Sequence, residues 1–242
     1  ATGARESLIL QAALILGFAT ATGGSRPLLL RAVGASLALP PFLITDAVSD
    51  TLLTLRGPNS TTAVVATNDN YTSTDAQNFA RVGAFPLGPG SRDSVILADL
   101  APGTYTAQVS TAPVGPNTGT ALVEIYDAAT SSTTAAGRLV NLSTRGQVGP
   151  GNLLFAGLVV SDGAPKHVLI RAAGPGLTQF GVSGVLAQPV LTLFSGSEAF
   201  RANTRWNTNA NAADIRTAAQ RVAAFAFAEG SADSALLLAL SP

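Results

Sequence analysis

The chain repeats itself, and this repetition constrains its fold more than any other feature of the sequence. Residues 14–37 align with residues 154–177, and residues 81–102 align with residues 221–242. All identical pairs in the two blocks are 140 positions apart, and they include Gly17 with Gly157, Arg31 with Arg171, Gly34 with Gly174 and Asp93 with Asp233. Two separate blocks in one register predict tandem domains of the same fold.

The repeat and the composition together set the expected domain boundaries. We expect a first domain, a linker rich in serine and threonine, and a second domain, at residues 1–127, 128–137 and 138–242. Because Pro242 aligns with Pro102, the second copy has no counterpart of the segments GTYTAQVS (103–110) and ALVEIYD (121–127). We therefore expect the second domain to be incomplete at its C-terminus, lacking its last two strands.

Short apolar runs between turn signals indicate strands. In GTYTAQVS, Tyr105, Ala107 and Val109 alternate with polar residues, which is the pattern of a half-buried strand. Several such runs at short spacing predict an all-β fold of two antiparallel β-sandwiches, jelly-roll-like in arrangement. Each is expected to carry a short helical segment, at residues 74–83 and 211–225. The first core is expected to hold inward-facing apolar residues: Leu14, Leu29, Leu53, Val95, Leu97, Tyr105, Val109 and Val123.

Composition excludes several classes of partner. Only 12% of the residues are charged and the formal net charge is zero, so nothing predicts binding to nucleic acid or to an anionic membrane surface. Residues 8–21 resemble the apolar part of a signal peptide but are shorter than the roughly 18 residues that span a bilayer. Because residues 14–20 correspond to residues 154–160, we expect a strand there and no membrane insertion. The absence of cysteine excludes disulfides and thiolate metal ligands.

The segment VLIRAAGPGL (168–177) has the apolar run and glycines of a phosphate-binding loop. A dinucleotide fingerprint needs three glycines at G-x-G-x-x-G spacing, and only Gly174 and Gly176 fit. The residue equivalent to Gly176 in the first copy is Ser36. Since a phosphate loop needs both glycines, we predict a strand followed by a turn.

The other candidates for chemistry are one histidine and two repeated pairs. His167 is the only histidine and has no counterpart in the first copy, so we expect it at a solvent-facing strand end. Arg31 and Arg171 could contact an anion, but their presence in both copies favours a guanidinium bound to a carboxylate or to loop carbonyls. Asp93 and Asp233 are expected to close turns through backbone amides. The sequence thus predicts no catalytic, cofactor-binding or metal residues.

The loop TNDNYTSTDAQ (67–77) gathers oxygen ligands of the kind that calcium prefers, at Asn68, Asp69, Asn70 and Asp75. The second copy has Arg205 in place of Asn70, so a calcium site stays open for the first copy alone. Tyr71 and Trp206 are equivalent, and each could stack on a sugar or pack as a lid on its own domain. The N-glycosylation sequons NST (59–61), NYT (70–72) and NLS (141–143) matter only in a host with that machinery.

Three segments of the first copy carry a resemblance to a known family. LTLRGPNSTTAVVATNDNY (53–71), SVILADLAPGTYTAQVS (94–110) and GTALVEIYDA (119–128) resemble the bacterial pre-peptidase C-terminal type of domain. With its lead-in, the whole unit looks like the tandem repeats of large secreted or cell-surface bacterial proteins. This resemblance implies a β-sandwich and export rather than an activity.

These observations favour a non-enzymatic, extracellular or cell-surface module with a structural or adhesive role. We expect it to self-associate as a subunit of a fibre, filament or surface layer, with strand exchange supplying the strands that the second copy lacks. The alternative is a carbohydrate- or polymer-binding accessory module of a secreted enzyme, which rests on Tyr71, Trp206 and the asparagine-rich loops.

Overall fold

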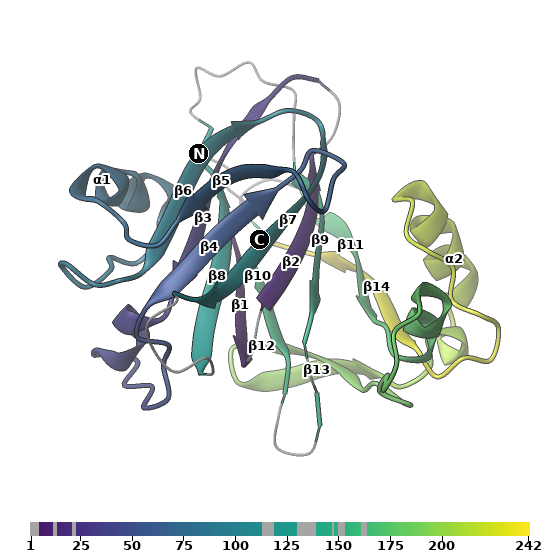
Figure 1. The fold of residues 1–242 in the computed structure, drawn as a ribbon. Coiled ribbons are helices and arrows are strands. Elements are labelled where there is room, and N and C mark those ends of the chain that lie inside the picture. The colour runs from purple at the N-terminus through teal and green to yellow at the C-terminus, as the bar shows by residue number, and fades with distance from the viewer. Residues whose placement is uncertain are drawn as a thin grey trace. The chain divides into compact units, whose positions relative to one another are not determined.

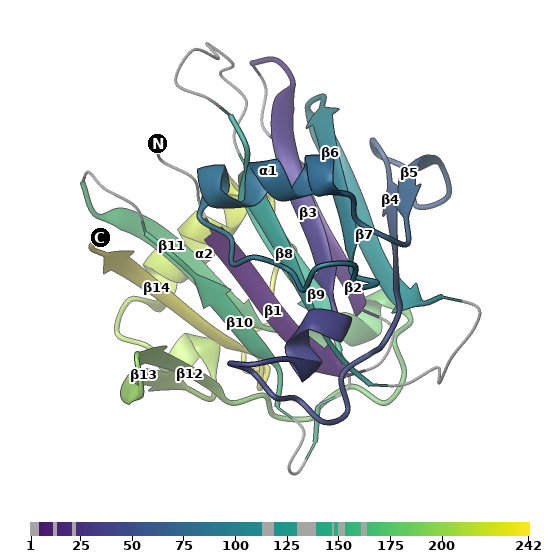
Figure 2. The same cartoon turned by 90° about the vertical axis from the view of Figure 1, so that its left-hand side faces the viewer.

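The computed structural model describes residues 5–11, 14–20, 23–112, 119–129, 139–146, 148–149, 153–160 and 164–242. These residues are mostly strand, and all the ladders between the named strands are antiparallel (Figures 1 and 2). The predicted all-β class is therefore confirmed. The chain divides into two compact units, residues 1–161 and residues 162–242.

The first unit consists of two five-stranded sheets, with strand orders β10-β1-β8-β3-β6 and β5-β4-β7-β2-β9. The strands are β1 (Arg5–Gln11), β2 (Leu14–Thr20), β3 (Arg26–Val33), β4 (Thr51–Arg56), β5 (Val64–Asn68), β6 (Ser94–Leu100), β7 (Gly103–Thr111), β8 (Thr120–Asp127), β9 (Leu139–Arg145) and β10 (Phe155–Leu158). The strands β7 and β8, which follow one another in the chain, lie in different sheets.

One buried cluster joins the two sheets of the first unit. It takes alternate residues from each sheet, including Leu28 and Ile125 from one sheet and Leu53, Tyr105 and Val109 from the other. Alternation along a strand places these side chains on one face, where they bury one another. Of the expected core residues, Leu53, Tyr105, Val109 and Val123 lie in this cluster, whereas Leu29 and Val95 are buried in a second cluster on the outer face of the sheet, with Phe79.

The prediction for Leu97 was wrong, because its side chain is 43% exposed. Leu97 lies on β6, the edge strand of its sheet, between the buried Ile96 and the half-buried Ala98. Alternation separates the two faces of a strand, but at a sheet edge one of those faces is only partly covered. The side chain of Leu14 lies outside the described residues.

A short helix covers the outer face of the sheet that contains β3, β6 and β8 (Figure 2). Helix α1 (Ser73–Val82) begins with a capping box between Thr72 and Asp75 and ends at Gly83, whose φ of 67° suits glycine. Its Phe79 packs with residues of the sheet's outer face. A 3₁₀ turn, η1 (Ala35–Ala38), follows β3. The helix predicted for this part of the chain is confirmed.

The second unit repeats these elements as two separate strand pairs. The strands β11 (Lys166–Ala172) and β14 (Ser234–Leu240) form one pair, and β12 (Leu191–Ser195) and β13 (Glu198–Asn203) form the other. Helix α2 (Ala212–Arg221) lies where the second helix was predicted, and short turns η2 (Pro175–Phe180) and η3 (Trp206–Thr208) complete the unit. A small core forms around Trp206, Ile215 and Ala235.

The boundary between the units differs from the boundary between the sequence copies. The sequence assigns residues 138–242 to the second domain, yet β9 and β10 pair with strands of the first unit. Most of the predicted linker, residues 128–137, lies outside the described residues.

Candidate functional site

Each unit contains a buried aspartate that closes the turn after β3 in the first unit and after β11 in the second. In the first unit Asp93 accepts hydrogen bonds from the backbone N–H of Gly34 at 2.7 Å and of Ser36 at 3.3 Å. In the second unit Asp233 accepts from Gly174 at 2.7 Å and from Gly176 at 3.0 Å. A buried carboxylate is costly unless it is hydrogen-bonded, so these amides hold it in place. We call this arrangement the aspartate clasp, and it confirms the predicted turn-closing role.

Close backbone packing explains the first glycine of each clasp. A Cβ atom added to Gly34 would lie 2.2 Å from the carbonyl oxygen of Val48, and one added to Gly174 would lie 2.1 Å from that of Leu186. No side chain fits such a contact. Close packing therefore requires glycine at Gly174, the first glycine of VLIRAAGPGL. This agrees with the predicted strand and turn.

A stacked arginine lies beside each clasp. The Arg31 guanidinium lies 4.6 Å from the ring centre of Phe79 and 4.5 Å from that of Phe85, and it donates to the Phe85 carbonyl at 2.7 Å. Arg171 lies 4.5 Å from Phe225 and 3.8 Å from Phe227, and it donates to the Phe225 carbonyl at 2.6 Å. Both arginines are bound to loop carbonyls, as the structural interpretation of these residues predicted.

The two arginines differ in their acidic partners. The Arg31 side chain is fully buried, and its Nε lies 3.0 Å from the carboxylate of Glu124 on β8. Arg171 makes no salt bridge within the part of the chain that the structure describes. Burial lowers the pKa of Arg171, and the charge of Asp233 opposes this by raising it.

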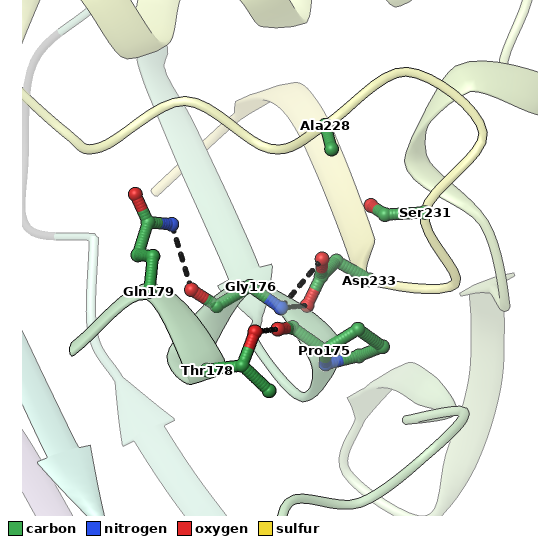
Figure 3. A pocket seen from close by; sticks show the side chains of 7 residues that line it. All are labelled: Pro175, Gly176, Thr178, Gln179, Ala228, Ser231 and Asp233. Atoms are coloured by element: carbon green, nitrogen blue, oxygen red, sulfur yellow. Dashed lines mark hydrogen bonds between the residues drawn. The ribbon is translucent and has the colours of Figure 1, made fainter. Parts of the chain in front are cut away.

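The second clasp borders a pocket of about 250 Å³ (Figure 3). In the first unit the Ser36 hydroxyl donates to Asp93, lies 3.2 Å from the Ser91 hydroxyl and accepts from the N–H of Gly88 at 2.8 Å. The second unit has Gly176 at the position of Ser36. The Ser231 hydroxyl, which corresponds to that of Ser91, is buried and has no hydrogen-bond partner among the described residues.

The polar groups around this pocket are mostly bound to the turn itself. Thr178 donates to the Pro175 carbonyl at 2.8 Å, and Gln179 donates to the Gly176 carbonyl at 2.7 Å (Figure 3). Asp233 is held by two amides. The pocket can therefore hold a small polar group at Ser231. The side chains of Thr178, Gln179 and Asp233 already make hydrogen bonds with the backbone of the turn.

The two aromatic residues considered for sugar binding pack into their own units. Trp206 is only 3% exposed, and its indole N–H donates to the Ala228 carbonyl at 3.2 Å. Tyr71 is half-buried and donates to the Gly88 carbonyl at 2.8 Å. Trp206 therefore packs as a lid on its own unit, and Tyr71 is bound to the loop at Gly88.

The asparagine-rich loop is tied to the neighbouring strand. The side-chain oxygen of Asn68 accepts from the N–H of Val95 at 2.9 Å, and its equivalent Asn203 accepts from the N–H of Ala235 at 3.1 Å. Asp75 caps α1. Within the described residues, no group of three or more histidine, cysteine or acidic side chains could hold a metal ion.

The isolated histidine and the sequons lie on the surface. His167 is exposed on β11, at the strand position opposite Ala239. The sequon asparagines Asn59, Asn70 and Asn141 are exposed as well.

Sequence reasoning did not identify Glu124 or the serines of the first clasp. Glu124 is buried in an apolar strand, and a lone acid in such a strand is a recognisable sign of a buried ion pair. Nothing in the pattern around Ser36 and Ser91 distinguishes them from ordinary turn serines.

Neither the protein-family models, nor the curated proteins, nor the solved structures contain a match to this chain. The described part of the chain includes no helix that is both long and apolar enough to cross a membrane.

Proposed function

We propose that the protein is a non-enzymatic structural repeat module of an extracellular or cell-surface assembly, such as a fibre, stalk or surface layer. The observation that carries this proposal is the way in which the copies share strands. Residues that belong to the second copy by sequence complete both sheets of the first unit. The first unit thus contains strands from both copies of the repeat.

The shared strands occupy one edge of each sheet. The strand β9 pairs with β2 in the register Gly17–Ser143, and β10 pairs with β1 in the register Ser7–Gly157. Leu139, Leu142 and Leu154 from the second copy also pack against the core between the sheets. Pulling the copies apart would break two backbone ladders and expose apolar surface, which suits a module that carries tension.

The polar clusters repeated in both units also support a structural role. The aspartate clasps and stacked arginines bind backbone groups of their own unit, so their chemistry is used to hold loops in place. The low charge, the absence of cysteine and the resemblance to exported repeat proteins support an extracellular or cell-surface location. Self-association into a filament or layer follows if further repeats of the same kind add to the second unit.

Immunogold electron microscopy of the native source, with antibodies against the full chain, tests this proposal. We expect labelling of regular filaments or of a surface layer outside the cell. Labelling confined to the cell interior would contradict the proposed location. Labelling of dispersed secreted particles without any regular assembly would contradict the structural role.

A further inference from the structure

Two strands of the second unit have an edge without a partner among the described residues. The strand β11 pairs only with β14, and β12 pairs only with β13. In the first unit the equivalent strands are central: β3 lies between β6 and β8, and β4 lies between β5 and β7. The first unit thus shows which strands occupy the equivalent edges there.

The apolar residues beside these edges are correspondingly less buried. Leu28 and Leu30 on β3 are fully buried, whereas their equivalents Val168 and Ile170 on β11 are half-buried. Likewise Leu53 and Leu55 are fully buried, and the equivalent leucines of β12, at positions 191 and 193, are half-buried. The inner faces of the second unit therefore carry apolar surface that additional strands would cover.

The charge of Arg171 restricts which strand can bind at this edge, beyond the need to cover apolar surface. In the first unit Arg31 and Glu124 face one another in the β3–β8 ladder, and their side chains form the buried ion pair. Arg171 holds the equivalent position on β11, opposite Ala235 of β14 on one side and open on the other. A strand added on the open side would place one of its residues directly opposite Arg171.

We propose that the open edge of β11 binds an antiparallel strand with a carboxylate opposite Arg171. This strand is the second part of a two-strand segment with the pattern of Gly103–Asp127, and the first part adds to β12 as β7 adds to β4. The occupant is a segment of this pattern, as Gly103–Asp127 is in the first unit, where β7 and β8 belong to the same copy as β3 and β4. The inference deepens the proposed function, because it names the chemistry that a strand needs to add to the edge of the second unit.

Backbone pairing alone would accept many strands, and Arg171 makes the edge selective. An added strand would bury the Arg171 guanidinium further. The strand must therefore place a negative charge beside it. An uncompensated buried charge costs far more than a paired one. A carboxylate also accepts the strong, charge-assisted hydrogen bonds that arginine donates. An apolar or amide side chain at this position should therefore bind more weakly.

The test uses the intact chain and a synthetic peptide of its residues 120–127, with lysines at both ends for solubility. The matched control is the same peptide with Glu124→Gln. Fluorescence anisotropy measures each affinity, and hydrogen exchange with mass spectrometry measures protection of β11. We expect the first peptide to slow exchange in β11 and to bind at least about tenfold more tightly than the control. With the Arg171→Gln protein, this difference between the peptides should disappear.

Three results would overturn the inference. The first is no slowing of exchange in β11 with either peptide. The second is equal affinity of the two peptides for the unaltered chain, a comparison that does not depend on how the Arg171→Gln protein folds. The third is full protection of the open edge of β11 in the monomeric chain alone, which would mean that this edge is not free to take a strand. Peptide binding does not depend on location, so failure of the microscopy test would leave this result intact.

Discussion

Replacing Glu124 by glutamine isolates the buried Arg31–Glu124 ion pair, which has no counterpart among the described residues of the second unit. The side chains of Arg31 and Glu124 are 0% and 4% exposed, so solvent cannot replace the lost charge. The hydrogen bond from the Tyr126 hydroxyl to Glu124, at 2.6 Å, can be kept by the amide oxygen. The substitution removes the negative charge that compensates the buried Arg31 guanidinium. Breaking such a pair from one side costs about 3–5 kcal/mol, and we expect this loss in the free energy of unfolding of the first unit.

Intrinsic fluorescence during urea unfolding can follow each unit separately. The only tryptophan, Trp206, belongs to the second unit, and the three tyrosines belong to the first. Glu124→Gln should shift the tyrosine transition and leave the tryptophan transition in place. The matched control is Glu229→Gln, which removes the surface pair with Arg216, whose side chains are 66% and 49% exposed. It should cost less than about 1 kcal/mol. A Glu124→Gln cost as small as the control's would refute the role assigned to the pair.

Three further outcomes are expected. Gly174→Ala should destabilise the second unit strongly in urea unfolding, because its Cβ would lie 2.1 Å from a carbonyl oxygen, while Gly149→Ala, with open space around it, should be close to neutral. Leu30→Ala, at a fully buried site, should cost about 2–5 kcal/mol, and Leu97→Ala, at an exposed one, should cost clearly less. Burial raises the pKa of Tyr105, so its folded state favours the neutral phenol; this stability is present below the ordinary tyrosine pKa of about 10 and is lost as the pH rises through the raised value. Ultraviolet titration should show a tyrosine ionisation step above the ordinary range, and Tyr105→Phe should remove that step.

The repeat predicted the parts of the structure that depend on local sequence. Asp93 and Asp233 close equivalent turns, and Arg31 and Arg171 bind equivalent loop carbonyls, because the same residues at the same spacing meet the same backbone. The packing of Trp206 could not be predicted in the same way, since an aromatic residue in a loop can face either solvent or core.

The pairing of strands across the copies was beyond sequence reasoning. A constant offset shows which residues are equivalent but not which strand each will pair with. By sequence β10 is equivalent to part of β2, yet β2 is an inner strand of its sheet and β10 is an edge strand of the other. Such a choice depends on which sheet edges are available, and this is a property of the assembled fold.

The strand sharing between copies is tested most directly by comparing two fragments, residues 1–161 and residues 1–129. The first contains β9 and β10, and the second ends before them. Urea unfolding followed by tyrosine fluorescence should show a cooperative transition for residues 1–161, at the same midpoint as the first unit of the full chain. Residues 1–129 should unfold at a clearly lower urea concentration, because both sheets lose an edge strand. Equal midpoints for the two fragments would contradict the account.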